Sequence, residues 1–231
     1  MNETVGDASV QRWARLSGFM YLFVMAVYLG GVAITSHFAV RGDPAATAVH
    51  IAAGESLYRA GLALQLVASW TTILLAGAFY ALLRPVSPML ALLALLWRTA
   101  EATIGGVAAA FAFIALENLR SFGDEAAGAG TLFMARLLNA GYVTLFQVAL
   151  IFFALGSILF FGLLYRSRYI PRALAGFGVL ASVLVVLLAF ARLIVPSTAE
   201  SLVAGWAPIF IAEFATGLHL LVRGATTRPH R

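Results

Sequence analysis

Residues 88–116 read PMLALLALLWRTAEATIGGVAAAFAFIAL, and this stretch decides the fold. It is long and apolar enough to cross a bilayer as one helix, because about 20 predominantly apolar residues span the hydrocarbon core. It nevertheless carries Arg98 and Glu101 near its middle, and a spacing of three residues places both on one helix face. Since a charged side chain at that depth costs roughly 2.5–3.5 kcal/mol on insertion scales, each of these charges needs a partner or a function.

The composition of the whole chain places most of it in lipid. Of its 231 residues, 62% are hydrophobic and 11% are charged, whereas about 25% of residues are charged in a typical soluble domain. The mean hydropathy is +0.94. The chain has no cysteine, which excludes disulfides, thiol nucleophiles and cysteine-based metal sites. The net charge of +5 comes from side chains near the expected helix ends rather than from one basic patch, so nucleic acid is not an expected partner.

Apolar segments of membrane-spanning length recur along the chain and predict an all-α integral membrane bundle of six transmembrane helices. We expect residues 1–231 to form a single transmembrane domain with a frayed tail over residues 1–11. A short interfacial helix over residues 45–53 should follow the first span, because Asp43 can cap its N–H groups and Pro44 fits a first turn. The expected spans cover residues 16–38, 60–83, 88–116, 138–164, 173–195 and 198–223.

Polar and proline-containing segments predict where these spans begin and end. Residues 117–130 are polar and rich in small residues, which indicates an exposed loop. Ser197 and Glu200 are spaced as in a capping box, so the last span should begin there. Pro208 should then kink that span, because proline removes a helical hydrogen bond.

The distribution of arginine predicts the orientation. Six spans leave both termini on one side of the membrane, and most arginines lie on that side while most acidic residues lie on the other. Because basic side chains concentrate in cytoplasmic segments, we expect both termini to be cytoplasmic. The arginines on the side of the termini are Arg12, Arg15, Arg84, Arg166, Arg168, Arg172, Arg223, Arg228 and Arg231.

Short motifs spread over nearly the whole chain resemble those of one known family. The motifs are ARLSGFMYL (14–22), GDPAATA (42–48), ESLYRAGLA (55–63), LLRPV (82–86), WRTAEATI (97–104), LLYRSRYIPRALAGFGVL (163–180) and IAEFATGLHLLVRG (211–224). In this order and spacing the chain resembles domain-of-unknown-function family 4386, a group of bacterial multi-pass membrane proteins. The resemblance implies the architecture and a place in the bacterial cytoplasmic (inner) membrane, which is a plasma membrane. It implies no catalytic residue, because the family has no settled activity.

Ionisable residues inside the expected spans form the candidate ligand-binding site. Arg98 and Glu101 in the third span and Glu213 in the last span lie at similar depth, so they could meet. One guanidinium would then face two carboxyl groups, and such a site could move a proton or bind a cation. If Glu101 pairs only with Arg98, a polar ligand could use Glu213 instead. The uncharged candidate residues on neighbouring spans are Gln65, Ser69, Thr72 and Gln147.

The same charges have a purely structural interpretation. Arg98 and Glu101 could neutralise each other and only hold the helices in register. A second, weaker candidate site consists of Arg166, Arg168 and Arg172, which could bind a lipid headgroup but could equally serve only to fix the topology.

The sequence predicts no metal site and no cofactor. It has no phosphate-binding glycine-rich loop, no HExxH zinc motif, no aspartate-rich pair for Mg²⁺ and no paired intramembrane histidines for a haem.

Three functions therefore stay open at this stage. The protein could bind a small molecule or lipid at a polar site near the bilayer midplane, with transport or sensing as the result. It could be a membrane-embedded enzyme that uses a buried carboxyl as general acid on an apolar isoprenoid- or epoxide-like substrate. It could also be a structural or accessory membrane subunit. The expected partners are the lipid bilayer and a small apolar or amphipathic ligand; whether the protein is an enzyme is left open.

Overall fold

The computed structural model describes residues 2–121, 128–195 and 203–226, and this part of the chain is all-α with seven helices. A short helix follows the first long one, as the sequence predicted. The elements are α1 (Asn2–His37), α2 (Pro44–Ala53), α3 (Glu55–Leu83), α4 (Pro88–Ser121), α5 (Ala129–Ser167), α6 (Arg172–Ile194), the 3₁₀ turn η3 (Val203–Trp206) and α7 (Ala207–Arg223).

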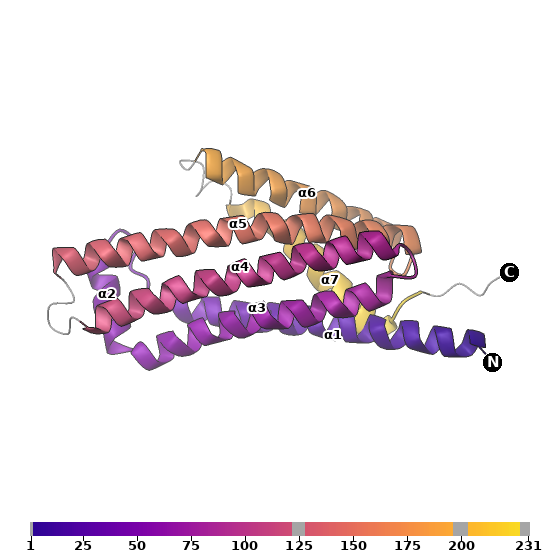
Figure 1. Ribbon diagram of the computed structural model, residues 1–231, viewed down its shortest axis with the longest axis horizontal. Coiled ribbons are helices and arrows are strands. Elements are labelled where there is room, and N and C mark those ends of the chain that lie inside the picture. Colours follow the sequence, from indigo (N-terminus) through magenta and orange to yellow (C-terminus); the bar gives the residue numbers. More distant parts are fainter. Residues whose placement is uncertain (1, 122–127, 196–202, 227–231) are drawn as a thin grey trace.

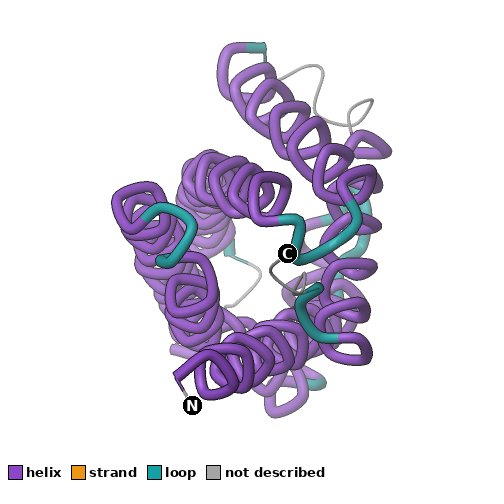
Figure 2. The backbone as a smooth tube through the Cα atoms, turned by 90° about the vertical axis from the view of Figure 1, so that its right-hand side faces the viewer, coloured by secondary structure: helices purple, strands orange, loops and turns teal. Residues whose placement is uncertain are grey.

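The long helices run side by side in an elongated bundle (Figure 1). Helix α4 packs along α5, α1 packs along α3, and α3 also contacts α4. Helix α7 lies against α1 and α6, while α2 lies across one end of the bundle. Seen from one end, the helices surround a common axis (Figure 2). This arrangement brings α1, α3, α5 and α7 around the middle of α4, where Arg98 and Glu101 lie.

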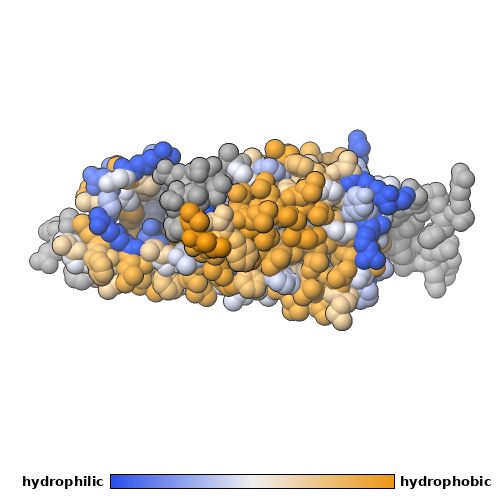
Figure 3. Space-filling view, turned by 90° about the horizontal axis from the view of Figure 1, so that it is seen from above, coloured by the Kyte–Doolittle hydropathy of each residue, from blue (hydrophilic) through white to orange (hydrophobic). Residues whose placement is uncertain are grey.

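Five helical segments are long and apolar enough to cross a membrane. A band of hydrophobic residues covers the middle of the face seen in Figure 3, and hydrophilic residues gather toward both ends. Because such a belt matches the hydrocarbon core between two headgroup layers, the chain is a multi-pass helical membrane protein. The five segments are Ala8–His37, Glu55–Leu83, Pro88–Arg120, Ala129–Ser167 and Arg172–Ile194.

The last helix differs from its prediction. Helix α7 has 17 residues and begins at Ala207, so it is shorter than the span expected over 198–223. The predicted kink at Pro208 is wrong, because Pro208 lies in the first turn of α7, where a proline breaks no helical hydrogen bond. The capping box predicted at Ser197 and Glu200 lies outside the described residues.

Residues 2–11, which were expected to form a frayed tail, are helical in the structure. Helix α1 begins at Asn2, since extending an existing helix costs far less than starting a new one. The Gln11 side chain anchors this extension: its Nε2 donates to the Ala225 carbonyl at 2.6 Å, and its Oε1 accepts from the Ala225 N–H at 3.1 Å. The two ends of the described chain therefore lie at the same end of the bundle.

The ends of α2 and of the loop between α4 and α5 differ in how closely they match the sequence prediction. The short helix predicted over residues 45–53 is confirmed as α2, and the Asp43 side chain caps it by accepting from the Ala46 N–H at 2.9 Å. The loop expected over 117–130 is shorter than predicted, because α4 continues to Ser121 and α5 begins at Ala129. The polar residue Glu117 is therefore helical, and it pairs with Arg59 of α3.

Glycines allow the close approach of α1 to its neighbours. A Cβ atom added to Gly18 would lie 2.6 Å from the Gly217 carbonyl oxygen of α7, and one added to Gly31 would lie 2.7 Å from the Gly61 carbonyl oxygen of α3. Contacts this short leave no room for a side chain, so these glycines fix α1 against both helices. They also fix the level at which Tyr21, which lies between them on α1, meets α7.

Candidate functional site

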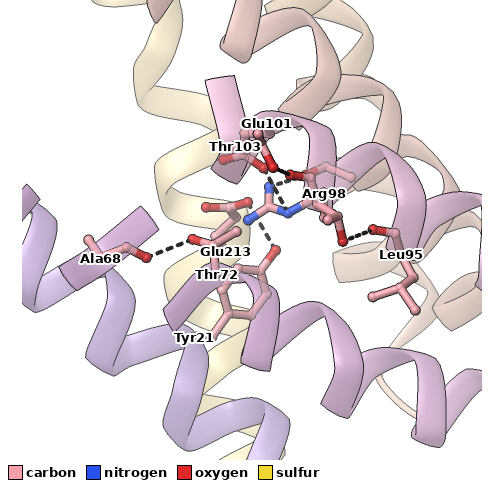
Figure 4. A network of polar contacts seen from close by, with 10 residues as sticks. Tyr21, Ala68, Thr72, Leu95, Arg98, Glu101, Thr103 and Glu213 are labelled. Carbon is pink, nitrogen blue, oxygen red and sulfur yellow. Dashed lines mark hydrogen bonds and ion pairs between the residues drawn. The ribbon is translucent and has the colours of Figure 1, made fainter. Parts of the chain in front are cut away.

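Arg98 and Glu101 form the ion pair that their spacing predicted (Figure 4). Arg98 is 4% exposed, and its Nε lies 3.1 Å from Glu101 Oε2. The N–H is not aligned with that oxygen, so Glu101 Oε2 receives no directed hydrogen bond from any described residue. The Glu101 carboxyl can therefore still accept a hydrogen bond from a ligand.

Helix α5 is shaped around the Arg98 side chain. Arg98 Nη1 donates a long hydrogen bond of 3.4 Å to Ser157 Oγ, and the guanidinium lies 4.6 Å from the centroid of the Phe153 ring. A Cβ atom added to Gly156 would lie 2.9 Å from both Cγ and Cδ of Arg98. The aliphatic part of Arg98 packs on Gly156, its charge pairs with Glu101, and the plane of its guanidinium lies near the Phe153 ring. These contacts hold the arginine in one position.

Glu213 joins this cluster from α7. Its carboxylate is 8% exposed and accepts a hydrogen bond from the Tyr21 hydroxyl of α1 at 2.9 Å. Arg98 is near enough to attract the Glu213 carboxylate electrostatically. The predicted meeting of Arg98, Glu101 and Glu213 is therefore present in the structure, with one guanidinium facing two carboxyl groups.

These charged groups line a cavity of about 250 Å³ in the middle of the bundle, which we call the central cavity. The predicted residues Ser69 and Thr72 of α3 also line it. Their hydroxyl protons are used within α3, by the carbonyls of Gln65 at 3.2 Å and Ala68 at 3.0 Å, so both hydroxyl groups offer mainly acceptor lone pairs. Most other residues around the central cavity are apolar: Val24, Met25, Leu29, Leu75, Leu150, Phe146, Phe153, Ile209 and Phe210.

The central cavity reaches the apolar surface of the bundle on one side. Its lining residues Leu29 of α1 and Phe210 of α7 are 44% and 43% exposed. Both are apolar, and Leu29 belongs to a segment that is long and apolar enough to cross a membrane. An apolar molecule in the bilayer would therefore meet an edge of the cavity directly.

Gln65 and Gln147 do not line the central cavity. Gln65 lies one helical turn before Ser69, where its Nε2 donates to Thr35 Oγ1 at 3.1 Å and its Oε1 accepts from the Tyr142 hydroxyl at 3.0 Å. It lines a separate cavity of about 90 Å³. Gln147 is 7% exposed, and its Oε1 has no hydrogen-bond partner among the described residues.

Two residues of the cluster were missed in the sequence analysis. Tyr21 and Ser157 lie in apolar segments and looked like ordinary span residues. Tyr21 could have been suspected, because a tyrosine hydroxyl far from either end of a span needs a hydrogen-bond partner. The Tyr21 ring is fixed by an edge-to-face contact of 5.3 Å with Phe79.

The three candidate headgroup arginines are only partly brought together. The Arg172 guanidinium lies 5.2 Å from the centroid of the Tyr165 ring, and Arg168 ends α5 in a left-handed conformation with a φ of 59°. Arg168 and Arg172 line a hollow together with Thr226, whereas Arg166 does not line it. Two arginines at one hollow give it a positive charge that suits an anionic group.

Within the described residues, no three His, Cys, Asp or Glu side chains gather as a metal site would require. The arrangement is suited to recognising one small polar group at the end of an apolar space.

Comparison with known proteins identifies the family alone. No curated protein and no solved structure matches this chain. The family model described as "Domain of unknown function (DUF4386)" matches residues 16–224, which include α1 from its apolar part through α7 and every residue of the charged cluster. The chain is therefore a member of the DUF4386 family.

Proposed function

We propose that this membrane protein binds a small, mainly apolar molecule in the central cavity and recognises it through one hydrogen-bond-donating or cationic group. Transport or sensing of that molecule would be the result. The main observation in support is that the charged cluster lines a cavity instead of being filled in by neighbouring side chains. A volume of about 250 Å³ lies just below the roughly 300–1,000 Å³ of ordinary ligand sites, so the ligand should be small.

The charges of the cluster favour a ligand group that donates hydrogen bonds over an anionic ligand group. Arg98 is already surrounded by Glu101, Ser157 and Phe153, so it has little capacity left for a ligand. Glu101 Oε2 lacks a directed donor among the described residues, and the hydroxyl groups of the cavity offer lone pairs. A ligand amine or hydroxyl would supply the missing donor, whereas a carboxylate would meet two carboxyl groups.

Thermal unfolding of the purified protein with three matched probes tests this proposal. Hexylamine should stabilise the protein most, hexanol less, and hexanoate not at all. A ligand at 100 times its Kd adds about 2.7 kcal/mol to the free energy of unfolding, which is readily measured. Glu213→Gln should reduce the effect of hexylamine, while Glu117→Gln, which changes a carboxylate outside the cavity, should not. Equal responses to all three probes, or equal responses of the two variants, would contradict the proposal.

The enzyme hypothesis is a second candidate, favoured by Glu101. This carboxyl lines an apolar cavity, and no described residue directs a hydrogen bond to its Oε2, so the position suits a proton donor to a substrate oxygen. Incubation with 1,2-epoxyoctane and water tests it, with the diol as the expected product. The parent protein should form the diol and Glu101→Gln should not. If no diol forms, or if both proteins form it equally, the enzyme hypothesis is wrong.

We also propose that η3 and α7 together complete a sixth membrane crossing within one domain, in the cytoplasmic membrane of a bacterium. The proposal is supported by the contact of Gln11 with Ala225, which brings the chain back to the end where it began. The excess of arginine at that end favours cytoplasmic termini. A fluorescent protein fused to the C-terminus should fluoresce and a fused periplasmic phosphatase should be inactive; the reverse result would overturn this topology.

A further inference from the structure

Two further cavities lie between the central cavity and the end of the bundle that carries α2. The first, of about 90 Å³, is the one lined by Gln65, Thr35 and Tyr142. The second, of about 340 Å³, lies beneath α2 and is lined by Asp43, Thr47 and Arg136 among others. The two cavities are adjacent, because they share the lining residues Thr35, Ile51, Tyr58, Ala115, Leu119 and Asn139.

A stack of aromatic rings separates the small cavity from the central cavity. The Phe146 ring of α5 lies parallel to the Tyr28 ring of α1, with centroids 6.1 Å apart, and nearly parallel to the Tyr142 ring, with centroids 6.3 Å apart. Tyr28 and Phe146 line the central cavity, whereas Tyr142 lines the small one. The hydrogen bond from Tyr142 to Gln65 completes the barrier on the side of α3.

This barrier is loosely built. Ring centroids in aromatic pairs lie roughly 4.5–7 Å apart, and both separations here are in the longer half of that range. By contrast, α1 and α3 are held rigidly at the same level, because Gly31 and Gly61 leave no space between them. An opening would therefore come from rotation of the rings on α1 and α5 rather than from separation of α1 and α3.

We propose that these cavities form an aqueous entrance from the α2 end to the central cavity, gated by Tyr28, Phe146 and Tyr142 with Gln65. It admits water and small hydrogen-bonding or cationic solutes. Polar side chains at each stage support this: Asp43 and Arg136 at the mouth, then Asn139, then Gln65. A volume of about 90 Å³ holds several waters, each of which needs about 30 Å³. The inference builds on the proposed function, because it gives the polar group of the ligand, or a proton, a path to the same carboxyl groups.

Cysteine labelling tests the entrance directly, because the chain has no cysteine of its own. Ser69→Cys places a thiol in the central cavity. The probe is 2-(trimethylammonium)ethyl methanethiosulfonate, which is permanently charged and cannot cross lipid. It is added to intact cells or to inverted membrane vesicles, so that each end of the bundle is reached separately. Asn139→Cys, which lines both outer cavities on the α2 side of the gate, reports which preparation exposes the α2 end.

The expected result is slow labelling of Ser69→Cys from the α2 end only. Adding Phe146→Ala removes both ring contacts and should raise the rate about tenfold or more, since each aromatic pair restrains the opening. Phe152→Ala is the matched control: it removes a ring from the same helix, one that packs on Trp97 away from the gate, and should not change the rate. Tyr142→Phe removes only the hydrogen bond to Gln65 and should give a smaller increase, so the test survives if Phe146→Ala fails to fold.

Three results would contradict the proposed entrance. Ser69→Cys could be labelled from the opposite end, it could react at the same rate with Phe146→Ala as with Phe152→Ala, or it could stay unlabelled while Asn139→Cys reacts. Leu74→Cys, 62% exposed on the lipid side of α3, sets the background rate. The experiment needs no ligand, so it fails separately from the proposed function. If hexylamine stabilises the protein but Ser69→Cys is never labelled, binding stands and entry is through lipid. If Ser69→Cys is labelled but no probe stabilises the protein, the entrance stands without the proposed ligand class.

Discussion

The hydrogen bond between Tyr21 and Glu213 should be one of the stronger single contacts in the bundle. Tyr21→Phe removes only the hydroxyl group and leaves the ring against Phe79. Hydrogen bonds to charged groups are worth about 1.5–3 kcal/mol in soluble proteins, whereas cycles in a membrane protein average about 0.6 and reach about 1.7 kcal/mol. Tyr21 and Glu213 are only 4% and 8% exposed, so we expect a coupling energy of about 1–2 kcal/mol, toward the upper membrane value.

A double-mutant cycle measures this coupling. Tyr21→Phe, Glu213→Leu and the double variant are unfolded from detergent micelles with increasing dodecyl sulfate, followed by tryptophan fluorescence. Tyr165→Phe is the matched control, because that tyrosine is 43% exposed at the end of α5 and its hydroxyl can be solvated. A coupling below about 0.3 kcal/mol, which is the scatter for independent sites, would refute the proposed contact. So would an equal loss of stability in Tyr165→Phe.

The remaining predictions concern the packing around the cluster. Arg98→Ala should cost about 3–5 kcal/mol because it leaves Glu101 unpaired, and Arg98→Met with Glu101→Leu should recover the part of that loss that comes from Glu101 in the same unfolding assay. A double variant as unstable as the single one would show that the loss does not come from the Arg98–Glu101 pair. Gly156→Ala should cost about 1–3 kcal/mol, because its Cβ would lie 2.9 Å from the arginine side chain, and it should cost much less once Arg98 is Ala. Additive losses would contradict this contact. Gly18→Ala should lower the melting temperature and Gly30→Ala should not, because only the first would place a Cβ against α7; similar melting temperatures would contradict the close packing of α1 and α7.

The sequence was sufficient to predict the charged part of the site. Arg98 and Glu101 are three residues apart on one helix, so helical geometry alone brings them together. Glu213 could be added because an ionisable residue at similar depth must also turn toward the interior of a bundle. The cap of α2 was equally predictable, since Asp43 and Pro44 act through local geometry that does not depend on the rest of the fold.

The uncharged part of the site could not be predicted in the same way. Gln65, Ser69 and Thr72 lie on one stripe of α3, but a stripe says nothing about which level of the bundle each side chain meets. Gln65 lies about 6 Å along the helix from Ser69, at 1.5 Å per residue, and Tyr142 binds it there. Its hydrogen-bond partner comes from a helix that is 77 residues away in sequence, and no local pattern reveals such a contact.

The start of α7 shows a second limit. Apolar residues continue on both sides of Pro208, so hydropathy predicted one kinked helix through it. A proline is equally compatible with a kink or with a first helical turn, and the choice depends on how the preceding residues pack. Here η3 ends at Trp206, which lines the central cavity, and α7 begins immediately after it. The same packing turns Glu213 toward Tyr21.

The most direct test of the account is an experimental map of the protein in lipid nanodiscs, at a resolution that shows side chains. We expect Arg98 paired with Glu101, the Tyr21 hydroxyl bonded to Glu213, and unassigned density in the space they line between α1, α3, α4, α5 and α7. A map in which Glu213 points into the acyl chains, or in which apolar side chains fill that space completely, would contradict the central claim that the buried charges serve a binding site.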